Sequence, residues 1–224
     1  MSILLLNEDE FTPKQISGLM AWFDAKPLYL NLDSNSYVSK WFDLSGNNFH
    51  LNQLIADNQP RLVDGSVVFD GSNDYLKSNE FTAISQPFTV LIVCKIINYV
   101  VNRSVYDGNA YASNTLYMQP SANYLRLYAG PTGSTVEADA GTNKVVIKTV
   151  TNGSSSSIQI NNNSVITGIL GSNLLRGITL GSRGDGSLNG NVAIDGFMLF
   201  NKVLSAAEEQ KLKSYCSKRY RFSL

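Results

Sequence analysis

The segment Val67–Leu76 constrains the fold most, because it places two short apolar runs on either side of a compact polar stretch. The runs are Val67–Phe69 and Tyr75–Leu76, and both contain residues that favour strands. Between them stand Asp, Gly, Ser, Asn and Asp. Glycine and asparagine tolerate a positive φ, and aspartate accepts hydrogen bonds from its own backbone. The segment therefore predicts a strand, a tight turn and a second strand.

Similar short strands are predicted along the rest of the chain, with one helix at its end. Residues 88–97 form a near-continuous apolar run, which is typical of a strand covered on both faces. Ser205 and Glu208 stand three residues apart, as in a capping box that begins a helix. One short helical turn is expected at Thr12–Gln15. The other predicted strands are Leu19–Asp24, Val38–Phe42, Leu125–Tyr128, Lys144–Val150, Ser157–Ile160 and Val192–Phe200.

Several sequence blocks stand in an order that resembles one known family. Val67–Leu76 resembles the motif V-x-F-D-G-x-x-D-Y-L, and Trp41–Asn48 resembles W-x-D-x-S-G-x-x. Ile178–Gly181, Leu188–Gly190 and a helix that starts with Leu-Ser-x-x-Glu follow near the end. Together these blocks are similar to laminin-G-like domains of the concanavalin A-like lectin and glucanase superfamily. Copies in bacteriophage structural proteins carry the same C-terminal pattern.

The resemblance implies an all-β fold, an antiparallel two-sheet jelly-roll sandwich with a short C-terminal helix. It covers residues 19–97 and 176–220, so we expect one domain whose N- and C-terminal strands pair. The expected division is an N-terminal arm with a short helical turn over 1–18 and a single laminin-G-like domain over 19–224. The fold hosts lectins, hydrolases, adhesion modules and virion proteins, so it indicates function only broadly.

The charge balance argues against nucleic acid and membrane partners. Lysine plus arginine and aspartate plus glutamate both number 18 among 224 residues, so no global field attracts phosphates. No run reaches the roughly 18 apolar residues of a membrane span. The apolar start Ile3–Leu6 has no basic residue before it and acids after it, unlike a signal peptide, so we expect an added strand or a docking arm. Cys94 and Cys216 are expected to be separate reduced thiols.

Residues suited to catalysis are sparse. The resemblance implies that glucan-cleaving relatives carry a Glu-x-Asp-x-Glu strand, in which alternate carboxylates share one face. The nearest stretch here is Glu137-Ala138-Asp139, which lacks the third acid. The one histidine, His50, is expected at a turn or at the edge of the core. We therefore expect a non-enzymatic protein.

The acidic turn is also a candidate metal site. Some relatives bind calcium through loop oxygens, so the resemblance implies Asp70, Asn73 and Asp74 as ligands, with Asp107, Asn109 or Asp185 approaching from other loops. The alternative is that Asp70 and Asp74 hold the turn by accepting backbone N–H groups. No cofactor other than calcium is expected.

Sugar recognition requires exposed aromatic faces beside amide and carboxyl groups. The tyrosine- and asparagine-rich residues 99–128 offer these groups, most densely at Tyr106, Asp107, Asn109 and Tyr111. These four are the predicted contacts to a glycan or a protein partner. The alternative is that alternate tyrosines fill the sandwich and the others edge an interface between subunits.

These features predict a virion structural or adhesion protein of a bacteriophage, on a fibre, tail, baseplate or capsid surface. Its lectin-like domain is expected to bind host-surface glycans or neighbouring virion subunits, as a homo-oligomer. We expect it to be made in the host cytoplasm without a signal peptide. Two alternatives stay open: a decoration or assembly protein without a ligand, and a calcium-dependent lectin or glycan hydrolase.

Overall fold

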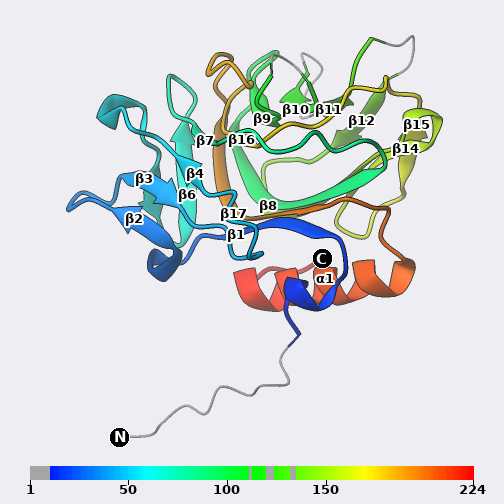
Figure 1. The fold of residues 1–224 in the computed structure, drawn as a ribbon, viewed down its shortest axis with the longest axis horizontal. Coiled ribbons are helices and arrows are strands. Elements are labelled where there is room, and N and C mark those ends of the chain that lie inside the picture. Colours follow the sequence, from blue (N-terminus) through cyan, green and yellow to red (C-terminus); the bar gives the residue numbers. More distant parts are fainter. Residues whose placement is uncertain (1–10, 111–112, 120–123, 132–134) are drawn as a thin grey trace, which may run out of the picture.

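The computed structural model describes residues 11–110, 113–119, 124–131 and 135–224. These residues form two antiparallel sheets packed face to face, with one α-helix on the outside of the first sheet (Figure 1). The predicted all-β, two-sheet sandwich with a short C-terminal helix is confirmed. Within the described residues, no helix is both long and apolar enough to cross a membrane.

The first sheet runs in the order β15-β14-β13-β8-β17-β6-β5, and β1 also pairs with β17. Its longest strands, β8 (Phe88–Asn98) and β17 (Asn191–Phe200), lie side by side at its centre. Strand β1 (Leu19–Asp24) runs antiparallel to β17, so the first and last strands pair as expected. The other strands are β5 (Arg61–Val63), β6 (Ser66–Asp70), β13 (Val145–Thr151), β14 (Ser156–Ile160) and β15 (Ile166–Gly168).

The second sheet runs in the order β12-β11-β10-β9-β16-β7-β4-β3-β2. Its strands are short, and the four at one end hold the irregular middle third of the sequence. These four are β9 (Ser104–Asp107), β10 (Thr115–Met118), β11 (Tyr124–Tyr128) and β12 (Val136–Asp139). The others are β2 (Leu30–Leu32), β3 (Val38–Trp41), β4 (Leu51–Asn52), β7 (Leu76–Ser78) and β16 (Thr179–Leu180).

The apolar run in β8 has a direct structural cause. Val90, Ile92 and alternate residues beyond them point into the core between the two sheets. Leu91 and Val93 point to the other face, into a second apolar cluster under the helix. From Phe88 to Cys94 both faces are covered and every residue is buried, which explains the apolar run that the sequence shows there.

The helix α1 (Ala206–Tyr220) closes the outer face of the first sheet (Figure 1). Ser205 caps it by accepting a hydrogen bond from the backbone of Glu208, whose carboxylate accepts one from the backbone N–H of Ser205, so the predicted capping box is confirmed. Leu212, Cys216 and Tyr220 recur every four residues and pack against the sheet. Single 3₁₀ turns lie at Pro13–Gln15, Pro27–Tyr29, Ala56–Asn58 and Gly153–Ser155.

The turn in Val67–Leu76 joins the two sheets. β6 belongs to the first sheet and β7 to the second, so the two strands that flank the turn do not pair with each other. Gly71 occupies the turn with a φ of 81°, which glycine adopts without a steric penalty. The segment therefore determines where the chain crosses from the first sheet to the second.

Candidate functional site

The residues predicted to contact a glycan lie mostly inside the protein. Tyr106 is 3% exposed, and its hydroxyl shares a hydrogen bond of 2.7 Å with that of Thr149 across the sandwich. Asn109 is 7% exposed and donates its side-chain amide to the carbonyl of Ser78 at 2.7 Å. Tyr111 lies outside the described residues. Tyr106 and Asn109 were predicted to contact a ligand at the surface, but both side chains are too buried in this structure to do so.

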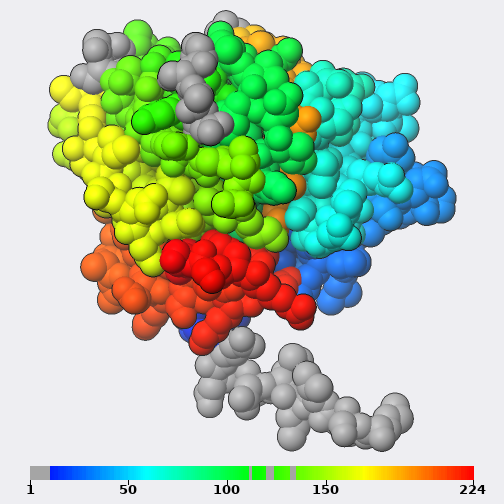
Figure 2. All heavy atoms as spheres, turned by 180° about the vertical axis from the view of Figure 1, so that it is seen from behind, coloured from blue at the N-terminus to red at the C-terminus, as the bar shows by residue number. Residues whose placement is uncertain are grey.

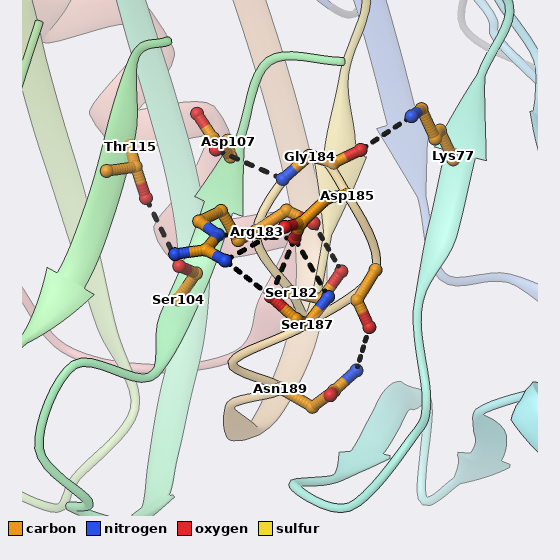
Figure 3. A network of polar contacts seen from close by, with 11 residues as sticks. Lys77, Ser104, Asp107, Thr115, Ser182, Arg183, Gly184, Asp185, Ser187 and Asn189 are labelled. Carbon is orange, nitrogen blue, oxygen red and sulfur yellow. Dashed lines mark hydrogen bonds and ion pairs between the residues drawn. The ribbon is translucent and has the colours of Figure 1, made fainter. Parts of the chain in front are cut away.

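Asp107, the third predicted contact in the described residues, is 1% exposed and holds loops together. One carboxylate oxygen accepts hydrogen bonds from the backbone of Gly108 at 2.8 Å and Asn114 at 3.0 Å. The other accepts from the backbone of Gly184 at 3.0 Å, in the loop before β17 (Figure 3). Burial raises the pKa of Asp107 to about 6, although these N–H groups oppose the shift. Its geometry is that of a structural carboxylate.

The loop between β16 and β17 adds a partly exposed ion pair to this junction. Nη2 of Arg183 lies 2.8 Å from one carboxylate oxygen of Asp185. The other oxygen accepts hydrogen bonds from the backbone N–H and the hydroxyl of Ser187. The Arg183 guanidinium holds the pKa of Asp185 well below its usual range. In Figure 3 the guanidinium of Arg183 points toward Ser104 on β9 and Thr115 on β10, two strands inside the second sheet.

The three candidate calcium ligands form the turn between β6 and β7. Asp74 accepts a hydrogen bond from the backbone of Asp70 at 3.0 Å, and Asp70 accepts one from the backbone of Ser72 at 2.7 Å. Asn73 donates its amide to the carbonyl of Asp57 at 2.7 Å. Among the residues that the structure describes, no three His, Cys, Asp or Glu side chains gather as a metal site. These bonds support the turn interpretation, and calcium binding stays a prediction.

Another group of side chains lies on the outer face of the second sheet. Along β10, β11 and β12, Leu116, Leu125, Leu127 and Val136 point into the core, so the residues between them point outward. We call the outward group the tyrosine face. Its members are Tyr117, Tyr124, Arg126, Tyr128, Glu137 and Asp139.

The strand register aligns the centre of the tyrosine face. Tyr117 pairs across β10 and β11 with Arg126, which pairs across β11 and β12 with Glu137. Arg126 donates to the Glu137 carboxylate and lies within hydrogen-bonding reach of the Tyr117 hydroxyl. Burial lowers the pKa of Arg126, but these two neighbours outweigh it and raise that pKa above the usual range.

Two more tyrosines flank this row and present aromatic surface. Tyr124 is 39% exposed and pairs with Asp139 on β12, and Tyr128 pairs with Thr115 on β10. Aromatic rings beside hydrogen-bonding side chains can hold a sugar ring by its apolar face and its hydroxyls. The sequence contained one signal for this face, the alternation of polar and apolar residues in Tyr124–Tyr128. This stretch belongs to the tyrosine-rich segment, but none of the four predicted glycan contacts lies in it.

The acids noted in the sequence as the nearest match to a glucanase motif also belong to this face. Glu137 and Asp139 lie two residues apart on β12, so both point outward. Glu137 is paired with Arg126, whereas Asp139 is exposed and accepts a hydrogen bond from the backbone of Gly141 at 2.8 Å. The two carboxylates therefore share one surface but have different partners.

Comparison with known proteins gives structural matches only. No protein-family model matches the sequence, and no curated protein does. Trypanosoma rangeli sialidase in complex with sialic acid matches with a TM-score of 0.60 and 14% identity, over 88% of this chain and 33% of the sialidase. The binding domain of botulinum neurotoxin DC in complex with SialylT matches with a TM-score of 0.59 and 17% identity, over 89% and 52%.

A third match is an arabinofuranosidase complexed with arabinofuranosyl-alpha-1,2-xylobiose. Its TM-score is 0.63 and its identity 13%, over 82% of this chain and 51% of the arabinofuranosidase. The chain thus spans about a third of the sialidase and about half of the other two proteins. At these identities the likeness concerns the fold.

These neighbours contradict the prediction of a non-enzymatic protein. Two of them are glycosidases, a sialidase and an arabinofuranosidase, and both contain a sandwich like this one. The prediction rested on the missing third carboxylate of a glucanase motif, which says nothing about other glycosidases. None of the three structures provides a link to bacteriophages. The chain therefore has a two-sheet β-sandwich, consistent with a concanavalin A-like fold and similar to regions of a sialidase, a toxin binding domain and an arabinofuranosidase.

Proposed function

We propose that this chain recognises carbohydrate and that the tyrosine face is its binding surface. The observation that carries the proposal is the aligned row of Tyr117, Arg126 and Glu137, flanked by exposed aromatic surface. The sialic acid and SialylT complexes of two structural neighbours support the choice of ligand class.

The chemistry of the row suits a glycan. A tyrosine ring packs against the C–H groups of a sugar, while the guanidinium and carboxylate donate to and accept from its hydroxyls. Because Arg126 and Glu137 bind each other, both side chains are already held in place before a ligand arrives. Strand spacing gives the row from β10 to β12 a length of about 10 Å.

Replacing Tyr117 with alanine is expected to weaken glycan binding roughly tenfold, since the ring supplies the apolar contact beside Arg126. The measurement is binding of the purified chain to a glycan array, followed by titration of the best ligand. The same samples are checked for released sugar, because the fold also occurs in glycosidases.

The matched control is Tyr37→Ala. Tyr37 is also an exposed tyrosine beside an arginine, with the Arg61 guanidinium 5.9 Å from its ring, but it precedes β3 near the other end of the second sheet. We expect this variant to bind like the unchanged chain. No binding to any sugar, or equal losses in both variants, would refute the proposal for the tyrosine face.

The setting that we propose is the surface of a bacteriophage virion, where the chain contacts host glycans and neighbouring copies. The support is the resemblance of the C-terminal blocks, from Ile178–Gly181 to the helix that begins after Ser205, to those of phage structural proteins. The expected result is that mass spectrometry finds the chain in purified phage particles and that surface labelling reaches it there. A chain found only in the lysate and never in particles would contradict this setting.

A further inference from the structure

A groove of about 750 Å³ runs between α1 and the chain that follows β1. Its lining residues belong to α1, β1 and the segments beside β1. In Figure 1 these elements lie on the opposite side of the first sheet from β10, β11 and β12, which carry the tyrosine face. The C-terminal end of α1, drawn in red, is exposed at the surface in Figure 2. The groove is not part of the proposed glycan site, so its lining residues point to a separate role.

One wall of the groove is aromatic. The ring of Tyr215 on α1 meets the ring of Phe11 edge-on, with centroids 6.2 Å apart, and the ring of Trp22 at the same distance. Trp22 is 8% exposed, and among the described residues its indole N–H has no acceptor. The wall therefore offers aromatic surface to apolar side chains and an N–H donor to an oxygen acceptor.

The rest of the groove is strongly basic. Arg219 is neutralised by Asp24, which accepts two hydrogen bonds from its guanidinium at 2.6 and 2.8 Å. In the part of the chain that the structure describes, this is the one ion pair of the groove. Four further cations line it, and within the described residues none of them forms an ion pair, although Lys26 lies close enough to Asp24 to interact with its charge: Lys26, Lys211, Lys218 and Arg221. An occupant should therefore carry negative charge as well as apolar groups.

The sequence supplies such an occupant. Phe11 is already part of the groove, and it is preceded directly by Glu8, Asp9 and Glu10 and then by the apolar run Ile3–Leu6. We propose that residues 1–10 bind in the α1 groove of their own chain, with the acids against the basic rim and the apolar run along the helix. Ten residues reach at most about 35 Å, more than the roughly 22 Å length of α1.

Cross-linking in the full chain tests the proposal. Cys94 and Cys216 are fully buried, so introduced cysteines are the thiols that a reagent reaches. Leu5→Cys is combined with Ser214→Cys, an exposed position of the groove, and treated with a short bismaleimide. The matched control combines Leu5→Cys with Asp139→Cys on the tyrosine face. We expect at least tenfold more cross-linking in the groove pair, within monomers.

Charge reversal adds a second measurement. Changing Glu8, Asp9 and Glu10 to lysine in the groove pair should lower its cross-linking roughly tenfold, and adding Lys211→Glu and Lys218→Glu should restore part of it. Equal cross-linking in the two pairs would overturn the proposal, and so would no effect of charge reversal. If the cross-linked product consists of dimers, residues 1–10 bind in the groove of a second copy, and the proposal of binding within one chain is overturned.

Discussion

Replacing Asp107 with alanine is expected to lower the free energy of unfolding by about 3 kcal/mol at neutral pH. The buried carboxylate accepts hydrogen bonds from the backbone of Gly108, Asn114 and Gly184, and alanine leaves all three N–H groups without that acceptor. These groups come from two loops, so the loss also frees the loop before β17 from β9. Urea denaturation followed by circular dichroism measures the change.

The control is Asp185→Ala in the same loop. The side chain of Asp185 is 39% exposed and its partner Arg183 also reaches solvent, so the expected loss is below about 1 kcal/mol. Equal losses in the two variants would contradict the structural role assigned to Asp107.

The second prediction concerns pH: the free energy of unfolding should fall as the pH rises from about 4 to about 6. Burial raises the pKa of both Asp74 and Asp107 to about 6, above the value of 3.8 for a free side chain. Between these values the folded chain binds more protons than the unfolded chain, so deprotonation favours unfolding. For Asp107, which is almost fully buried, the loss is about 2 to 3 kcal/mol and is complete above pH 6.

Two exposed carboxylates limit this trend on the acid side. Arg183 lowers the pKa of Asp185, and Lys202 lowers that of Glu208, so their contribution to stability is lost as the pH falls below about 4. Stability should therefore peak near pH 4. Urea denaturation at steps across this range measures the curve.

Asp74→Asn isolates one of the two raised groups. Asparagine keeps an oxygen that can accept from the backbone of Asp70, as Asp74 does at 3.0 Å, but it carries no charge. We expect a flatter dependence on pH and a more stable chain at pH 7. An unchanged slope would mean that Asp74 does not titrate in this range.

The fold could be predicted because its signals are local. The apolar run in β8 indicated a strand covered on both sides, and the helix and the second sheet provide that cover. The capping box of Ser205 and Glu208 is encoded within four residues. The polar turn of Val67–Leu76 was also correct as a turn, but its role in joining two sheets depends on strands far away in sequence.

The site was harder because its residues meet over long range. Asp107 is polar and stands beside turn residues, which indicated a surface position. Its buried carboxylate accepts a hydrogen bond from the backbone of Gly184, 77 positions later in the chain. The tyrosine face depends on the pairing of Tyr117 with Arg126, and a shift of one residue would turn the same side chains into the core. Turn lengths set that register, and residue types alone do not reveal it.

The position of α1 has a consequence for many copies held together. The helix covers the outside of the first sheet, while the tyrosine face lies on the outside of the second (Figure 1). A scaffold that grips the chain on its helix side would leave each tyrosine face pointing away from the scaffold. Copies arrayed in this way would engage several sugars at once, so weak individual contacts would add up to high avidity.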